Sequence, residues 1–284
     1  MLAESVALTK HRYDQLTELF HKYDLILPQA FNDHDVNLNA PRLFTDEIYL
    51  FYLLETLILE TTYYNISMED AVNDDILTFF TSVIKDTLDM HLRVKKIAKQ
   101  KALYIPLPAI PKQEKVEFVE DKQFLSGWFG DKRPLLATEI SHLTKNARRN
   151  ALGHAVITAF SQVVQSKEIR RFFERGQAIS AKHIEVFESI LRNENLPSSV
   201  ILLTPYVTES TDPPFTDKIM TLFITQLIEI GVGSYGLSTA LSARRDLGTM
   251  YARLVGEIAK YSNDGAEILI KKGWMEKPPM AVDR

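Results

Sequence analysis

Residues 44–108 of this chain can be laid on residues 215–279 without a gap, at a constant offset of 171, and their characteristic residues coincide. The coinciding positions are Phe44-Thr45-Asp46 with Phe215-Thr216-Asp217, Tyr64 with Tyr235, Ser67 with Ser238, Asp75 with Asp246, Lys101 with Lys272 and Pro108 with Pro279. An internal repeat defines the structural unit of a chain, because each copy is expected to fold in the same way. The sequence therefore predicts an internal duplication.

Each repeat carries a pair of amphipathic helices. From Asp75 the apolar residues recur at steps of mostly three and four, which is the period of a helix with one buried face. The repeat 171 residues later has the same pattern, and Thr45 and Thr216 are N-cap candidates for the helix that precedes each. Two more helices are expected in the second repeat, from Ile140 to about residue 164 and from Ile169 to about residue 191. This pattern predicts an all-α fold.

The segment that joins the second and third of these four helices is too long for a tight turn. It runs from residue 196 to residue 215 and contains Pro197, Pro205, Pro213 and Pro214, whereas helix connections in bundles typically take roughly 2 to 8 residues. An extended chain covers about 3.3 Å per residue, so this segment can run the whole length of a helix of roughly 40 Å. The crossover predicts the up-down-down-up path of a ferritin-like bundle.

The offset also predicts how the chain is divided. We expect a first, incomplete helical bundle over residues 1–108, a linker over 109–134 that is rich in proline and charge, and a second four-helix bundle over 135–284. Subtracting the offset from the first helix of the second repeat gives a position before residue 1, so the first bundle is expected to lack its first helix. The pair Lys10-His11, which matches Lys182-His183 at an offset of 172, marks the next helix.

A bundle that lacks one helix is expected to expose an apolar face, and exposed faces of that size usually bind a partner. We predict self-association through this open face, or coverage of the face by a helix from elsewhere in the chain. A truncated reading frame is the simpler alternative.

Composition excludes several functional classes. A net charge of -4 with a pI near 6.0 gives no reason to expect binding to nucleic acid or to an anionic membrane. The chain has no cysteine, so disulfides and thiolate-bound metals are excluded, and histidine and carboxylates are the only strong metal ligands left. The apolar run 48–59 is too short for a bilayer, which needs about 20 residues. The start of the chain does not resemble a secretory signal, which predicts a cytoplasmic protein.

No phosphate-binding loop and no serine-nucleophile motif occurs, so no catalytic residue is predicted. A ferritin-like bundle nevertheless raises the question of a dinuclear metal site, which uses Glu-x-x-His tetrads on two helices. Two tetrads are present, Glu18 to His21 and Glu139 to His142, but they lie near the ends of non-equivalent helices.

A stronger metal candidate follows from depth in the second bundle. His154 and His183 lie symmetrically about the turn near residue 168, so an antiparallel hairpin brings them to one level, which Glu229 and Glu257 also reach. Two imidazoles and two carboxylates can hold iron, manganese or zinc. The alternative is that the histidines are neutral core residues bonded to helix carbonyls or to these carboxylates. We favour the alternative, because Ile58 replaces Glu229 in the first repeat.

Several short motifs are characteristic in combination. They are Asp35-Val36-Asn37, Ala40-Pro41-Arg42-Leu43-Phe44-Thr45-Asp46, Arg133-Pro134-Leu135, Phe160-Ser161-Gln162, Pro214-Phe215-Thr216-Asp217-Lys218 and Gly273-Trp274-Met275-Glu276-Lys277-Pro278-Pro279. In these motifs the chain resembles, over essentially its whole length, the family catalogued as domain of unknown function 3231, found in spore-forming bacilli and related to spore coat protein F. The resemblance implies two tandem ferritin-like bundles and a spore-related setting, and it implies no established activity.

Two hypotheses for function follow. We favour a non-catalytic bundle that needs no cofactor and acts by self-association or by binding other proteins, in the cytoplasm or in association with the spore. The alternative is a ferritin-like metal-binding protein or metal-dependent oxidase that uses His154, His183, Glu229 and Glu257 to hold iron, manganese or zinc.

Overall fold

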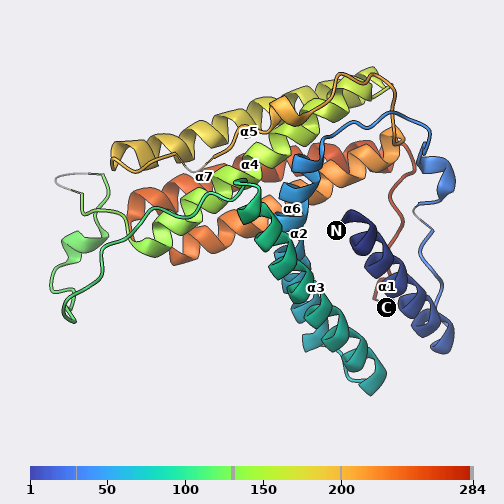
Figure 1. Cartoon of the computed structure of the whole chain (residues 1–284), viewed down its shortest axis with the longest axis horizontal. Helices are drawn as coiled ribbons and strands as arrows, with labels where there is room; N and C mark the ends of the chain where they lie inside the picture. The colour runs from blue at the N-terminus through green and yellow to red at the C-terminus, as the bar shows by residue number, and fades with distance from the viewer. Residues whose placement is uncertain (30, 129–131, 199, 282–284) are drawn as a thin grey trace. The chain divides into compact units, whose positions relative to one another are not determined.

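The computed structural model describes residues 1–29, 31–128, 132–198 and 200–281 (Figure 1). Within these ranges the regular structure is helical, apart from one isolated antiparallel bridge between Val36 and Phe215. The helices are α1 (Leu2–Lys22), α2 (Asp46–Glu69), α3 (Asp74–Gln100), α4 (Ala137–Val163), α5 (Lys167–Asn193), α6 (Asp217–Leu241) and α7 (Arg245–Lys271), with short 3-10 turns η1 (Asp33–Asp35), η2 (Lys122–Leu125) and η3 (Thr204–Tyr206). The all-α prediction is confirmed.

The chain divides into two units. Unit 1 contains Met1–Asn32, Phe44–Tyr104 and the end of the chain from Glu276, and it holds α1 to α3. Unit 2 contains Asp33–Leu43 and Ile105–Met275, and it holds α4 to α7. The crossover segment Asp33–Leu43, which lies in the first repeat by sequence, thus belongs to unit 2. The predicted boundaries at residues 108 and 134 stay a prediction, and residues 129–131 of the expected linker lie outside the described ranges.

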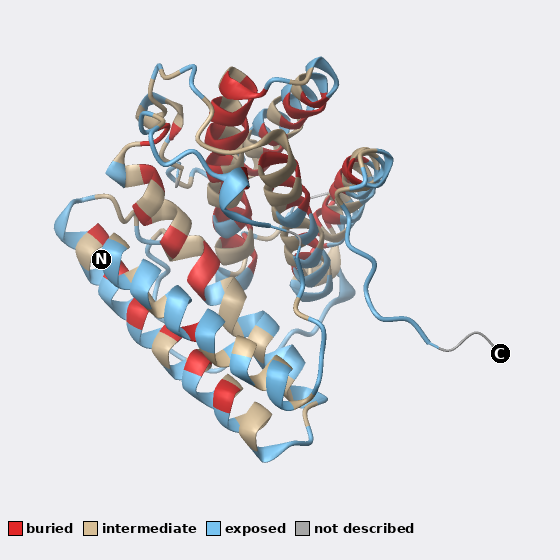
Figure 2. Ribbon diagram, turned by 90° about the vertical axis from the view of Figure 1, so that its right-hand side faces the viewer, coloured by how far each residue is buried: buried red, intermediate tan, exposed pale blue. Residues whose placement is uncertain are grey.

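Unit 2 is a bundle in which α4 packs on α5 and α6 packs on α7, with further contacts between α4 and α6 and between α5 and α7. Buried residues form stripes along these helices (Figure 2). On α4 the stripe includes alanines at four-residue steps, namely Ala147, Ala151, Ala155 and Ala159, all buried. Small side chains on one face allow a neighbouring helix to approach closely. On α5, Gly176 has the same effect, because a Cβ there would lie 2.8 Å from Cζ of Tyr261.

Hydrogen bonds at the ends of the helices in unit 2 show in which direction each helix runs. The Asp217 carboxylate at the start of α6 accepts hydrogen bonds from the backbone N–H of Gln165 (3.0 Å) and of Ser166 (2.8 Å), in the turn between α4 and α5. At the opposite end, the N–H of Arg244, the N-cap of α7, donates to Glu139 near the start of α4 at 2.9 Å. Helices α5 and α6 therefore run in one direction, and α4 and α7 in the other.

Unit 1 is built on the hairpin of α2 and α3, with α1 packed against α3. Its core is a cluster of Leu50, Leu53, Leu57, Met90, Val94 and Ala98. The one buried residue of α1 is Arg12, whose Nη2 donates to Thr87 Oγ1 at 2.6 Å and to the Val83 carbonyl at 3.3 Å on α3. Helix α1 thus joins the unit by a buried polar contact at its centre and by Leu2 and Leu8, which pack against the core cluster.

Among the described residues, α6 is the one helix that is long and apolar enough to cross a membrane by length and composition, with a mean hydropathy of 1.3 in its most apolar window. The shorter apolar run at residues 48–59 lies within α2. A core helix of a bundle passes the same test, and α6 packs on both α4 and α7. However, only 28% of that window is buried, and Leu237 and Leu241 lie at the surface.

Candidate functional site

His183 lies at the centre of the core of unit 2. It belongs to the buried stripe of α5, which recurs at helical spacing as Ile169, Phe172, Phe173, Gly176, Ser180, His183, Phe187 and Leu191. Its side chain is 0% exposed, its Nδ1 lies 3.0 Å from the Tyr235 hydroxyl on α6, and its Nε2 lies 3.2 Å from a Glu257 carboxylate oxygen on α7. Both ring nitrogens are therefore engaged by protein groups from the two neighbouring helices.

This geometry assigns the tautomer of His183. An ionised carboxylate only accepts hydrogen bonds, so Nε2 carries the hydrogen and donates to Glu257. Nδ1 then accepts from the Tyr235 hydroxyl, whose oxygen accepts in turn from Asn150 Nδ2 of α4 at 2.6 Å. The four side chains form one directed chain of hydrogen bonds with a neutral imidazole inside it. Burial lowers the pKa of His183, although Glu257 opposes that shift, and the neutral form is thereby favoured.

Glu257 closes this chain at the surface, where its side chain is 29% exposed. Both of its oxygens accept hydrogen bonds from Lys182 Nζ at 2.8 Å. Partial burial works to raise the pKa of Glu257, but the hydrogen bonds from Lys182 and His183 outweigh it and hold the pKa below its ordinary value. The carboxylate is therefore ionised and neutralised by a lysine.

The structure brings together two of the four residues predicted to hold a metal, His183 and Glu257. His154 is half-buried on α4, where burial lowers its pKa, and Glu229 is exposed on α6. In the described part of the chain, no three histidine, aspartate or glutamate side chains are grouped as a metal site requires. The contact between His183 and Glu257 is the one that the alternative of a core histidine bonded to a carboxylate requires, and metal binding stays a prediction.

A second polar network joins α4 to α6, and the sequence analysis missed it. Asn146 Nδ2 donates to the buried Ser238 at 2.8 Å, its Oδ1 accepts from Ser234 at 2.7 Å, and Ser238 Oγ lies 3.1 Å from His142 Nδ1. A signal was available, because Tyr235 and Ser238 are two of the positions at which the repeats coincide. Tyr235 accepts a hydrogen bond from Asn150 of α4, and Ser238 accepts one from Asn146.

A buried cluster of charges closes one end of unit 2. Glu139, which is 1% exposed, accepts from Arg133 Nη1 and Nη2 at 2.8 and 2.9 Å and from the N–H groups of Leu136 and Arg244 at 2.9 Å. Burial works to raise the pKa of Glu139, but these donors outweigh it and keep the pKa below its ordinary value. The glutamate of the predicted Glu-x-x-His tetrad is thus a structural anion at a helix start.

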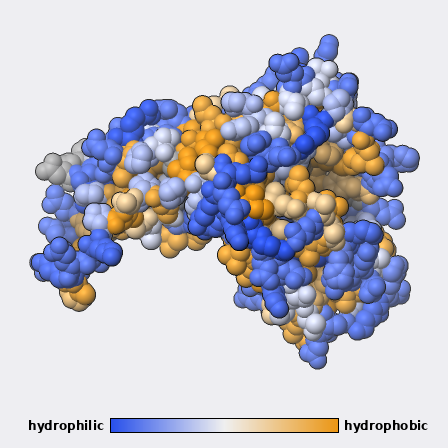
Figure 3. All heavy atoms as spheres, in the orientation of Figure 1, coloured by the Kyte–Doolittle hydropathy of each residue, from blue (hydrophilic) through white to orange (hydrophobic). Residues whose placement is uncertain are grey.

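Unit 1 presents a face that is apolar and open. Along α1 the residues Val6, Thr9, Tyr13, Leu16 and Phe20, which we call the α1 stripe, recur at steps of three and four. Val6 is 69% exposed and Tyr13 64% exposed. One counterpart 171 positions later, Gln177 of α5, donates from Nε2 to Thr158 Oγ1 of α4 at 3.0 Å. Hydrophobic side chains lie among hydrophilic ones where α1 to α3 form the surface (Figure 3).

Pairs of equivalent positions show how far this face is uncovered. Leu16 of the α1 stripe is 39% exposed, whereas Phe187, 171 residues later, is 0% exposed. Ser67 of α2 is exposed, whereas its counterpart Ser238 is fully buried against α4. Within the described residues, unit 1 holds three long helices and unit 2 holds four.

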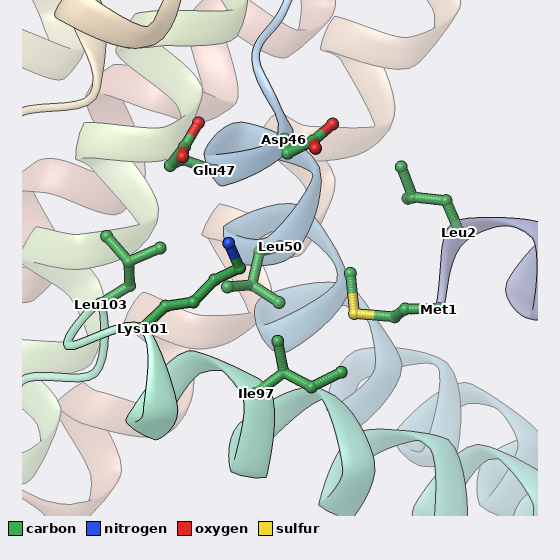
Figure 4. A pocket seen from close by; sticks show the side chains of 8 residues that line it. All are labelled: Met1, Leu2, Asp46, Glu47, Leu50, Ile97, Lys101 and Leu103. Atoms are coloured by element: carbon green, nitrogen blue, oxygen red, sulfur yellow. The ribbon is translucent and has the colours of Figure 1, made fainter.

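A pocket of about 250 Å³ lies in unit 1, where the beginning of α1 faces α2 and α3 (Figure 4). Its wall is formed by Met1, Leu2, Leu50 and Ile97, which belong to or pack against the core cluster of the unit. Glu47 and Lys101 also line it. The pocket thus has an apolar wall that adjoins the core cluster of unit 1, and residues of both charge signs lie beside it.

Comparison with known proteins gave two matches. A family model described as "Protein of unknown function (DUF3231)" matches residues 1–116 and 123–284. Among solved structures, the chain is similar to a Bacillus halodurans C-125 crystal structure described as a "putative spore coat protein", with 15% identity and a TM-score of 0.49, over 53% of this chain and 98% of that one. No curated protein sequence was found to match.

Proposed function

The chain belongs to the DUF3231 family, and we propose that it is a non-catalytic helical-bundle protein that acts by binding protein, with a second copy of itself as the partner at the open face of unit 1. The observation that carries this proposal is the α1 stripe. Large apolar side chains are exposed there, whereas the counterpart Phe187 in unit 2 is fully buried and the counterpart Gln177 contacts α4.

The proposal rests on the duplication, and the structure supports it element by element at the same offset of 171. Helices α3 and α7 begin and end at equivalent residues, α1 and α5 end at equivalent residues, and so do η1 and η3. Residues with positive φ recur too, Asp24 with Asn195 and Ala102 with Gly273. The helix directions in unit 2 favour the up-down-down-up path of a ferritin-like bundle.

The same offset changes the alignment of the N-terminal region. At an offset of 171, the counterpart of His183 is Arg12, and Arg12 is the one buried residue of α1, as His183 is buried in α5. Arg12 also lies over the ring of Tyr64, 5.8 Å from its centroid, as His183 meets Tyr235. We therefore replace the offset of 172, which paired His11 with His183, by a constant offset of 171.

Three features favour a second copy as the occupant. The alternating steps of three and four in the α1 stripe are the spacing of a helix-pairing seam. Each copy presents the same stripe, so a twofold contact buries two stripes at once. The exposed charges of α1 include Lys10, Asp14 and Glu18, so both signs flank the seam and two copies do not oppose like charges.

Self-association is tested by the mass of the purified chain in solution, measured by light scattering after size exclusion at micromolar concentration. We expect a dimer, and we expect Tyr13→Lys to weaken the association at least tenfold, because it places two charges in the seam, for a loss of about 1.4 kcal/mol or more. Leu92→Lys on α3 is the matched control, since Leu92 is also 64% exposed but lies outside the stripe. A monomeric parent, or equal effects of the two variants, contradicts the proposal.

The metal-binding alternative stays a prediction, and the metal content of the purified chain tests it. His183 and Glu257 lie in contact, but Nδ1 and Nε2 of the histidine are both engaged. We expect elemental analysis of the purified chain to find iron, manganese and zinc well below one equivalent. Near-stoichiometric metal that is lost in His183→Ala would establish the alternative.

The setting proposed for this binding is the spore. It rests on the motifs that resemble the spore-coat-related family, such as Pro214-Phe215-Thr216-Asp217-Lys218. Immunodetection in washed spores of the source organism supports this setting, and detection in growing cells alone contradicts it.

A further inference from the structure

The two crossover segments of the chain exchange hydrogen bonds in unit 2. The N–H of Asn37 donates to the Pro214 carbonyl at 2.9 Å, and the N–H of Thr208 donates to the Leu43 carbonyl at 3.0 Å. At the offset of 171, Asn37 corresponds to Thr208 and Leu43 corresponds to Pro214. Each of the two hydrogen bonds is therefore the image of the other with the repeats interchanged.

Reciprocal contacts of this kind define an isologous, twofold interface, in which residue i meets residue j and the copy of j meets the copy of i. Two unrelated segments that touch by chance have no reason to satisfy this relation. The backbone bridge between Val36 and Phe215 lies beside the first of these bonds. The pairing is therefore a short antiparallel contact between equivalent segments of the two repeats.

Side chains anchor both segments at this contact. Asp35 is buried, its backbone carbonyl accepts from the N–H of Thr216 at 3.0 Å, and its carboxylate accepts from the Thr216 hydroxyl at 2.9 Å. The Thr208 hydroxyl donates to the Arg42 carbonyl at 2.7 Å, and Gln162 of α4 donates to the Thr208 carbonyl at 2.9 Å. Hydrogen bonds to a charged, buried acceptor are stronger than neutral ones, so Asp35 is the strongest point of the contact.

We propose that the crossover segment is a self-complementary pairing surface whose partner is another copy of the same segment, and that this chain supplies both copies as a covalently fused pair. The inference rests on the duplication advanced under the proposed function. It adds a second interaction surface, formed by Asp33–Leu43 and by residues 204–217, which is separate from the α1 stripe. A chain that carried a single repeat would be expected to pair in trans through this surface.

The connection between the repeats can be cut to test this. A specific protease site is placed in the full chain at Glu114-Lys115, where the surrounding residues are exposed, and the folded protein is cleaved. The test uses the Tyr13→Lys background, so that pairing of two N-terminal fragments through the α1 stripe does not complicate the elution. We expect the two fragments to elute as one species, because the crossover contact does not depend on the connection.

The contact itself is then removed by Asn37→Pro, which lacks the donor N–H, with Asn37→Ala as the control that keeps it. We expect the cleaved proline variant to separate into fragments at a concentration at least tenfold higher than the cleaved alanine variant does. Asp35→Ala, which deletes the carboxylate that accepts from the Thr216 hydroxyl, is expected to act in the same direction should the proline variant lose its helical circular dichroism. Fragments that separate in the cleaved parent, or that stay together in all variants, overturn the proposal.

Discussion

Replacing Glu139 by alanine is expected to lower the free energy of unfolding of unit 2 by about 3–5 kcal/mol, the range found when one partner of a buried ion pair is removed. The carboxylate is buried and accepts four hydrogen bonds, two from Arg133 and two from backbone N–H groups. The alanine variant leaves the Arg133 guanidinium, whose side chain is 13% exposed, without its carboxylate. The N–H of Arg244, at the start of α7, loses its acceptor as well.

This effect is measured by urea unfolding followed by circular dichroism. Glu185→Ala is the control, because Glu185 pairs with Arg192 at 2.7 Å where both side chains are largely exposed. A surface pair of this kind contributes about 0 to 1 kcal/mol, so the control is expected to stay close to the parent. Equal losses in the two variants would show that burial does not set the strength of the Glu139 cluster.

The Glu139 cluster also shows which parts of a site a sequence does not reveal. The sequence allowed the tetrad Glu139 to His142 to be interpreted as a weak metal motif. In the structure Glu139 instead contacts Arg133, which shortly precedes it, and the N–H of Arg244, which follows far later in the sequence. Nothing local marks Arg244 as the residue that meets the start of α4. The contact between Glu139 and Arg244 depends on the directions in which the helices run. The sequence predicted these directions only through the length of the crossover segment.

The helices themselves were predictable because apolar residues at helical spacing give a direct signal. Helix α7 begins at Arg245 and ends at Lys271, close to the periodic stretch in the sequence. The predicted metal ligands were harder to place. The position of one residue along a helix gives its depth in the bundle, but it does not establish that its side chain lies on the buried face. Glu229 was placed by depth, yet its side chain points to solvent, and Tyr235 meets His183 instead.

Lowering the pH from 7.5 to 5.5 is expected to destabilise unit 2 in a way that depends on His183. Burial lowers its pKa in the folded state, so the unfolded chain binds the proton more readily. Stability from this group is therefore complete above the unfolded pKa of about 6.5 and is lost as the pH falls below it. One group of this kind changes the free energy of unfolding by at most about 1.4 kcal/mol per pH unit.

The hydrogen-bond chain explains why protonation of His183 is unfavourable in the folded state. Protonation places a hydrogen on Nδ1, facing the Tyr235 hydroxyl, which already accepts from Asn150. The hydroxyl hydrogen then loses its acceptor in a fully buried position, which costs about 1–3 kcal/mol. Glu257 partly compensates the charge, while Lys182 and Arg253 oppose it. Glu257 itself has a lowered pKa, so its own contribution is lost only at more acidic pH, below about 4.3.

The measurement is the free energy of unfolding at pH 7.5 and 5.5 for the parent and for His183→Gln, which can hydrogen-bond but does not titrate. We expect a smaller difference between the two pH values in the variant. The difference does not vanish, because burial also lowers the pKa of His142 and His154 in unit 2 and of His91 in unit 1. His11→Gln, at an exposed position of α1, is expected to keep the parent's difference. An unchanged difference in His183→Gln would mean that the imidazole binds its proton as readily inside the bundle as in the unfolded chain, which its buried chain of hydrogen bonds opposes.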